Sequence, residues 1–275
     1  MGKIQAYGDL ASFFRNSSDF LSGDEFANNL FWEVYRNFRE NGKTAWSGNV
    51  FLKGKILLSG VIMPSGYLLL SSGTEDASLR LANYGKKKKW KIRGVTGPDQ
   101  SATSFGREWL KGRKESPVCK KEFMIYSTSC LSFLEGRQPT ELKVAESANW
   151  PRVQAWTTLF ANESVPPLDC NALLSMSRTM MLKGNLFLLH KEGVGTCAMG
   201  GFGRSTPRSL VINEVFVPKE LRGMRYGEDL IAGLVGQAKA RKKSHCILFS
   251  DYGGRKNLYD RLGFEKTVKF CELSF

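Results

Sequence analysis

Strand and helix signals alternate through the second half of the sequence, and their order constrains the fold more than any other feature. Two strand patterns flank a hairpin turn, and a third strand pattern leads directly into the clearest amphipathic helix of the chain. A strand, a short helix and a final strand follow. The expected ranges are 185–190, 194–201, 210–217, 226–242, 246–249, 255–262 and 264–273. This alternation predicts a mixed α/β domain.

Two helices are expected before those strands, one after Pro151 and one capped by Asp169. The first half of the sequence also mixes the two kinds of signal. We expect helices over 25–38 and 75–84, strands over 46–58, 91–95 and 122–129, and a turn at 96–98 leading into a helix that ends near Lys111. The chain becomes more polar over 140–150. Since 275 residues suit one large or two small domains, we expect an α/β domain over 1–148 and a second over 149–275.

Composition restricts the class of protein. The chain has 40 basic and 26 acidic residues, a net charge of +14, and no apolar run near the roughly 20 residues of a membrane helix. The N-terminal segment has no signal-peptide pattern. The six cysteines form no CxxC pair and the two histidines lack neighbouring ligands, so we expect free thiols, a cytoplasmic protein and no metal site.

The connection between strand 210–217 and helix 226–242 is a candidate phosphate-binding site. Unpaired backbone N–H groups and the positive end of the dipole at a helix N-terminus both suit phosphate. Arg222 and Arg225 add positive charge, and Gly223 and Gly227 let the backbone approach an anion closely. The alternative interpretation is an ordinary strand-to-helix turn with solvated arginines.

This connection resembles motif A of the GNAT superfamily of N-acetyltransferases, which reads R/Q-x-x-G-x-G/A. The later strand 247–251, followed by the segment 257–264 with its Tyr259-x-x-x-Gly263-Phe264 ending, looks like motif B of that family. The helix Trp156–Glu163 and the entry Val215–Gly223 resemble a group of two-domain predicted acetyltransferases. The resemblance implies a GNAT fold over 149–275, α/β (α+β) with a central mixed, mostly antiparallel sheet. A diverged GNAT-like α/β domain, which could contribute to the acceptor site, would precede it.

By this resemblance, the loop amides would hold the pyrophosphate of acetyl-CoA and the strand end would hold its pantetheine arm. The implied cofactor-binding residues are Val215, Phe216, Val217, Arg222, Gly223, Met224, Arg225, Tyr226, Gly227 and Asn257. Two positions depart from the pattern. Arg225 replaces the middle glycine, where it could crowd the pyrophosphate, require a positive φ, or add a phosphate contact. Lys256 stands where the group has asparagine, and Asn257 follows it.

Acetyl transfer from a thioester to an amine needs a proton acceptor, donors for the carbonyl oxygen, and a proton for the leaving thiolate. Tyr259 is the candidate general acid, unless it is only a packed aromatic residue. Glu214 lies among apolar residues in a strand and is the candidate general base, directly or through water. A pairing with an arginine, or exposure at a sheet edge, would also explain Glu214.

These observations favour an acetyl-CoA-dependent N-acetyltransferase with one cofactor per chain and direct transfer to a primary amine of a small molecule or peptide. One alternative is a non-catalytic acyl-CoA-binding protein of the same fold. Another is a basic nucleic-acid-binding module that uses Lys86–Lys89 and 241–243, which we do not favour because helix ends are commonly solvated. We expect no membrane partner, and a monomer or homodimer.

Overall fold

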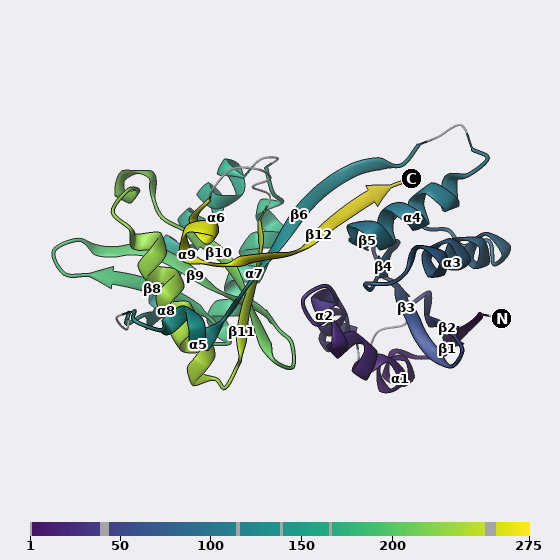
Figure 1. Ribbon diagram of the computed structural model, residues 1–275. Helices are drawn as coiled ribbons and strands as arrows, with labels where there is room; N and C mark the ends of the chain where they lie inside the picture. The colour runs from purple at the N-terminus through teal and green to yellow at the C-terminus, as the bar shows by residue number, and fades with distance from the viewer. Residues whose placement is uncertain (1, 39–43, 114–115, 138–139, 165–166, 251–256) are drawn as a thin grey trace. The chain divides into compact units, whose positions relative to one another are not determined.

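The computed structural model describes residues 2–38, 44–113, 116–137, 140–164, 167–250 and 257–275 (Figure 1). The chain divides into two compact units. The first unit contains Met1–Ile125 and Thr267–Phe275, and the second contains Tyr126–Lys266. Both divisions fall inside long strands, β6 (Val118–Ser129) and β12 (Glu265–Ser274). The boundary expected at 148/149 lies within the second unit, in the short helix η1 (Ser147–Asn149).

The first unit has a sheet with the strand order β1-β2-β3-β4-β5-β12. Its neighbouring strands are antiparallel except for β4 and β5, which run parallel. Its other elements, in chain order, are β1 (Lys3–Tyr7), α1 (Leu10–Gly23), α2 (Asn29–Phe38), β2 (Trp46–Leu52), β3 (Lys55–Ile62), β4 (Tyr67–Leu70), α3 (Glu75–Lys87), β5 (Gly94–Pro98) and α4 (Asp99–Leu110).

The second unit has a sheet with the strand order β6-β11-β10-β9-β8-β7. Strands β7 to β10 are antiparallel neighbours, whereas β10 and β11 are parallel. After β6, its elements are α5 (Cys130–Leu134), β7 (Lys143–Val144), η1, α6 (Trp150–Glu163), α7 (Cys170–Leu182), β8 (Leu186–Lys191), β9 (Gly195–Ser205), β10 (Ser209–Phe216), η2 (Lys219–Leu221), α8 (Tyr226–Ala240), β11 (His245–Ser250) and α9 (Leu258–Leu262).

The two units repeat one order of elements. In each, a strand is followed by two helices, three antiparallel strands, a helix, a parallel strand and a last helix. A long strand follows each series, β6 after α4 and β12 after α9. The two strands are exchanged: β12 belongs to the sheet of the first unit and β6 to the sheet of the second. Strand β12 follows α9 but pairs antiparallel with β5, from Phe270 opposite Pro98 to Ser274 opposite Gly94. Strand β6 follows α4 but lies next to β11.

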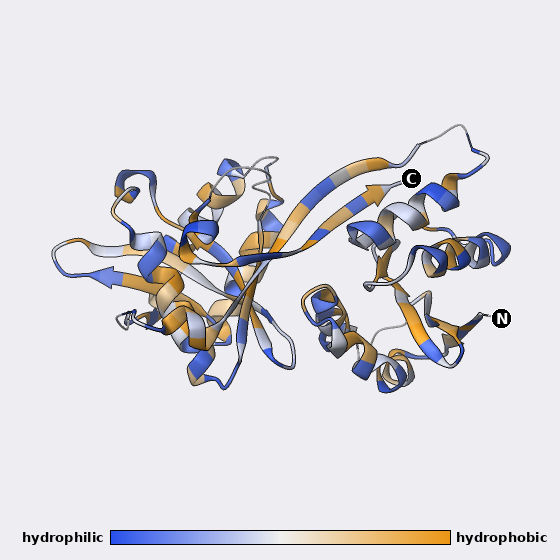
Figure 2. Ribbon diagram, viewed as in Figure 1, coloured by the Kyte–Doolittle hydropathy of each residue, from blue (hydrophilic) through white to orange (hydrophobic). Residues whose placement is uncertain are grey.

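Each sheet buries an apolar core against its helices. In the first unit, Leu68, Leu81, Phe105 and Leu273 belong to one buried cluster, so the C-terminal strand helps to build this core. Helix α3 buries Ala77, Leu81 and Ala82. The alternating blue and orange along α3 in Figure 2 shows this amphipathic pattern. Burial of a single helix face explains why spacing in the sequence predicted this element.

Most predicted elements of the second half are confirmed, but the first half contains differences. Residues 96–98, predicted as a turn, belong to strand β5. This prediction was wrong because glycine here serves close packing: a Cβ on Gly97 would lie 2.8 Å from the Leu70 carbonyl oxygen. Strand β1 and helix α1 were not predicted from the sequence. Helix α1 is capped by Asp9, whose carboxylate accepts the Ser12 N–H at 2.7 Å.

Candidate functional site

The parallel strands β10 and β11 separate before either strand ends. Their pairing runs from Ser209 opposite His245 to Ile212 opposite Leu248. On its other side, β10 shifts register against β9 between Asn213 and Phe216. An extra residue in one strand of a pair forms a β-bulge, which bends the strand and redirects a side chain. The bulge lies directly before the connection to α8.

Glu214 is the residue that the bulge redirects. Its backbone φ is +54°, a left-handed conformation, and its side chain is 4% exposed. Ser177 Oγ of α7 donates to Glu214 Oε2 at 2.6 Å, whereas Oε1 has no hydrogen-bond partner among the described residues. Burial raises the pKa of Glu214 to about 7, and the Ser177 hydrogen bond opposes the rise. Within the part of the chain that the structure describes, Glu214 pairs with no arginine, and β10 lies between β9 and β11 instead of at a sheet edge.

A carboxyl group with a pKa near neutrality suits general-base chemistry at physiological pH. Glu214 was identified from the sequence, but Ser177, which donates to it, and Thr157, which contacts Ser177, were not. Both are fully buried on faces that are otherwise apolar. Thr157 lies four residues after Val153 and four before Ala161, which are the other buried residues of α6. A threonine at a helix position whose neighbours four residues away are both apolar was the signal in the sequence that could have identified Thr157.

The N-terminus of α8 leaves a run of backbone donors without acceptors. Arg225 is the N-cap, with φ +62°, and its side chain does not cap the helix. Its carbonyl oxygen accepts the N–H groups of Glu228 and Asp229. Within the described residues, the N–H groups of 223–227 have no backbone acceptor. The positive φ that the sequence analysis considered for Arg225 is therefore confirmed.

Arg222 fastens the connection between β10 and α8. Its Nε donates to the Val217 carbonyl oxygen at 2.9 Å, and its Nη2 donates to Glu163 Oε2 of α6 at 2.5 Å. Lys219 lies 3.9 Å from the same carboxylate. Phe216 packs against Trp156, with 5.9 Å between the ring centroids. These contacts hold the loop while its tip, Gly223–Arg225, stays exposed.

Asn257 and Tyr259 are placed by the N-terminus of α9. Asn257 Oδ1 accepts the N–H groups of Tyr259 and Asp260, both at 2.9 Å, and Asn257 Nδ2 donates to the Tyr126 hydroxyl at 3.0 Å. The ring of Tyr259 lies 5.9 Å from that of Tyr126 and 5.8 Å from that of Phe264. Asn257 is thus a capping residue that fixes Tyr259, and Lys256 lies outside the described residues.

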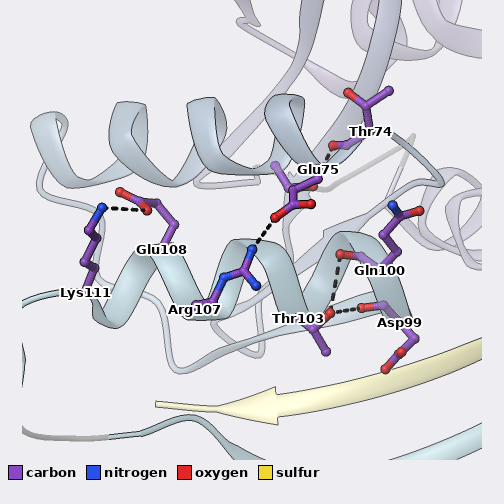
Figure 3. Close-up of polar contacts among 9 residues, drawn as sticks. Thr74, Glu75, Asp99, Gln100, Thr103, Arg107, Glu108 and Lys111 are labelled. Carbon is purple, nitrogen blue, oxygen red and sulfur yellow. Dashed lines mark hydrogen bonds and ion pairs between the residues drawn. The ribbon is translucent and has the colours of Figure 1, made fainter.

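The first unit offers no equivalent N-terminus. Helix α3 follows β4 as α8 follows β10, but the Thr74 side chain caps it by accepting the Ala77 N–H at 3.3 Å. Its first turn contains Glu75 and Asp76, and Glu75 pairs with Arg107 of α4 (Figure 3). Acidic residues do not distinguish the two helix starts, because the first turn of α8 also contains Glu228 and Asp229. The Thr74 cap does distinguish them, because it occupies a backbone donor that a phosphate would need. The expected single cofactor therefore fits the α8 end better than the α3 end.

The basic runs have structural uses. Lys86 and Lys87 form the last turn of α3, and the adjacent Trp90 packs against Trp46 at 4.6 Å and Tyr84 at 5.8 Å between ring centroids. Trp90 is therefore engaged in packing instead of being free to stack on a base. In the second run, Arg241 donates to Asn185 and Gly184, and Lys243 donates to the carbonyls of Thr206 and Pro207.

The thiols are free, and four of the six are buried: Cys130, Cys197, Cys246 and Cys271. Across the described part of the chain, no group of three or more histidine, cysteine or acidic residues is arranged to hold a metal ion. No helix found there has the length and apolar character needed to cross a membrane.

Comparison with solved structures identifies the fold. An acetyltransferase of the GNAT family from Colwellia psychrerythraea superposes with a TM-score of 0.62 at 12% identity, over 99% of each chain. A GCN5-related N-acetyltransferase from Sphaerobacter thermophilus gives 0.57 at 13% identity, over 88% of this chain and 84% of that one. A tandem GNAT protein from the clavulanic acid biosynthesis pathway gives 0.56 at 10% identity, over 100% and 98%. No family model matches the sequence. No curated protein matches it either.

Proposed function

Since the chain has the fold of the GNAT acetyltransferases, with two GNAT-like units in tandem, we propose that its second unit is an acetyl-CoA-dependent N-acetyltransferase. The acceptor is a primary amine of a small molecule or peptide, and the acetyl group moves directly, without an enzyme-bound acetyl intermediate. The observation that carries the proposal is the combination of separating parallel strands, a bulged and buried Glu214, and the unoccupied donors at the start of α8.

The start of α8 fits the phosphates of coenzyme A. The N–H groups of 223–227 have no backbone acceptor in the described structure, and a Cβ built on Gly223 meets no atom within 4 Å, so an anion can approach. The Arg225 side chain is exposed and adds positive charge at the loop. We expect the backbone of Met224, Tyr226 and Gly227 to contribute to the same site.

Each residue near the site has a proposed task. When bound, acetyl-CoA supplies an activated acetyl thioester. Backbone N–H groups of Val215 and Val217 would orient the pantetheine arm and polarise the carbonyl oxygen, with Phe216 packed behind them. Glu214 would remove a proton from the acceptor amine, and Tyr259, positioned by Asn257, would donate a proton to the departing sulfur. The ammonium group loses two protons in the reaction: one passes from Glu214 to solvent, and the other, released from nitrogen as the C–S bond breaks, restores the Tyr259 hydroxyl.

Binding and transfer are tested separately. We expect acetyl-CoA to raise the melting temperature, because a ligand that binds only the folded state stabilises it. Arg222→Glu with Arg225→Glu should abolish that rise, whereas Lys87→Glu, an exposed charge reversal at the end of α3, should preserve it. An unchanged melting temperature of the original protein at saturating acetyl-CoA would contradict the proposed cofactor.

Transfer is measured as thiol release with a panel of primary amines. We expect turnover with at least one amine, and a decrease of roughly 10²- to 10⁴-fold in Tyr259→Phe, as for removal of a general acid. Phe133→Leu, a conservative change at another buried ring, serves as the control for altered packing. Acetyl-CoA binding without turnover on any amine would instead support the non-catalytic alternative.

A further inference from the structure

Two hydroxyl groups connect Glu214 to the helices α6 and α7. Ser177 Oγ donates to Glu214 Oε2 at 2.6 Å, and Ser177 Oγ and Thr157 Oγ1 are 2.8 Å apart. Thr157 and Ser177 are 0% exposed and Glu214 is 4% exposed. One buried chain of hydrogen bonds therefore runs from α6, through α7, to the bulge of β10.

The proton order in this chain follows from the donors available. Ser177 has a single hydroxyl proton, so when it donates to the carboxylate, Thr157 must donate to Ser177 Oγ. A helical serine commonly donates to the carbonyl oxygen four residues earlier, and Leu173 O lies 3.0 Å from Ser177 Oγ. The contact with Glu214 is shorter, as expected for a hydrogen bond to an ionised acceptor.

This chain of hydrogen bonds holds Glu214 Oε2 and leaves Glu214 Oε1 without a donor among the described residues. Glu214 Oε1 is buried and has no partner among the described residues. The neighbouring Asn213 Oδ1 is also buried without a partner there, and its amide group contacts Met176 Sδ of α7 at 3.7 Å. Unsatisfied buried acceptors are costly, so they favour the entry of a group that carries N–H or O–H donors.

We propose that Ser177 and Thr157 are positioning residues, which hold Glu214 Oε2 so that Oε1 receives the proton of the acceptor amine. This proposal rests on the proposed function. Since Oε1 is covered in the structure, the proton reaches it through an intervening water. One N–H bond of the ammonium breaks and one O–H bond forms on Oε1, while Ser177 keeps its own proton throughout.

The groups around Glu214 explain why these hydroxyls matter. The described side chains of the adjacent cluster on α6, α7 and β10 are apolar, among them Trp156, Met176 and Phe216. Burial raises the pKa of Glu214 and the Ser177 hydrogen bond lowers it, and no charged group among the described residues contributes to the shift. Ser177 is thus the contact in the described structure that favours the ionised, proton-accepting form.

The test compares Ser177→Ala with Ser175→Ala, which removes an exposed hydroxyl from the same helix. In Ser177→Ala we expect kcat at neutral pH to fall about tenfold and the midpoint of its pH profile to rise by about one unit, with KM for acetyl-CoA unchanged. Ser177→Thr should restore the original profile. An unshifted midpoint in Ser177→Ala would overturn the proposal.

Thr157→Val and Thr158→Val form a second matched pair, because Thr158 is a half-buried threonine of the same helix that donates to Gln154 O and is separate from the contacts of Glu214. The midpoint of the pH profile of kcat should rise in Thr157→Val, by less than it does in Ser177→Ala. In Thr158→Val it should equal that of the original protein. If no amine is acetylated, the proposed function fails, but the positioning role is still measured by the pH dependence of unfolding. In Ser177→Ala, the pH range over which the unfolding free energy falls should extend to higher pH than in the original protein. The same pH dependence of the unfolding free energy in both proteins would contradict the role.

Discussion

At the scale of single residues, Glu214 and Arg225 depart from the ordinary conformations of their residue types. Both adopt left-handed backbone conformations, with φ +54° and +62°. Such conformations are unfavourable for residues with a Cβ and persist where the surrounding structure enforces them. The sequence identified both positions, Glu214 as an acidic residue in an apolar strand and Arg225 as a replacement for glycine. It did not reveal the bulge, which depends on pairing with β9.

Replacing Glu214 with glutamine should change how stability depends on pH. The folded-state pKa is raised from 4.5 to about 7, so the folded state binds the proton more tightly than the unfolded state. Stability of the original protein therefore falls as pH rises from about 4.5 to about 7, by about 3 kcal/mol. Glu214→Gln lacks this titration. The difference in unfolding free energy between Glu214→Gln and the original protein should therefore shift in favour of the variant by about 3 kcal/mol as pH rises from about 4.5 to about 7. Denaturant titrations at several pH values measure this difference, and a constant difference would contradict the burial of the carboxyl.

Replacing Arg225 with glycine should stabilise the second unit. Glycine adopts positive φ without the steric cost that a Cβ imposes, a gain of about 1 kcal/mol. Arg225→Ala keeps the Cβ and should give no such gain, which makes it the matched control. The same variants separate conformation from charge: acetyl-CoA should bind both more weakly than the original if the guanidinium contacts phosphate. Equal stabilities of the glycine and alanine variants would show that the left-handed conformation is absent.

At the scale of elements, the start of each helix determines what it can bind. Helix α3 is capped by the Thr74 side chain, whereas α8 begins at Arg225, whose side chain does not cap the helix. Both helices carry two acidic residues in the first turn. The sequence predicted α8 closely, because its apolar residues recur at helical spacing. It could not show that Asn257 caps α9 and bonds to Tyr126, since those residues are 131 positions apart. Contacts at such separation have no local sequence signal.

Asn257→Ala should destabilise the protein and impair the tyrosine that it positions. Loss of an N-cap costs about 1 kcal/mol, and the lost bond to Tyr126 adds to it. Asn257→Asp retains the two accepted backbone bonds and should recover most of the stability. Thermal unfolding measures the first effect, and kcat measures the displacement of Tyr259. Full stability in Asn257→Ala would rule out the capping role.

At the scale of the whole molecule, the repeat and the exchanged strands decide where each unit begins and ends. The expected two-domain GNAT arrangement is confirmed at the level of the fold. The exchange could not be predicted, because β6 and β12 each satisfy the strand pattern wherever they pair. Only the sheet order shows that the last strand of the chain lies beside β5.

Leu273→Ala tests this exchange. Leu273 is 5% exposed and belongs to the core of the first unit. Truncation of a buried leucine costs about 2–5 kcal/mol. Hydrogen exchange should therefore accelerate in β4 and β5 more than in β9 and β10. The exposed Leu182→Ala is the control, with little expected change. Faster exchange confined to the second unit would contradict the strand order.

The central claim is that the start of α8 binds the phosphates of acetyl-CoA, and amide hydrogen exchange tests it most directly. The N–H groups of 223–227 lack backbone acceptors in the described structure, so they should exchange rapidly in the free protein. Saturating acetyl-CoA should slow their exchange, and leave the N–H groups at the start of α3 unchanged. Protection at α3 alone, or no protection at 223–227 while acetyl-CoA is bound, would contradict the account.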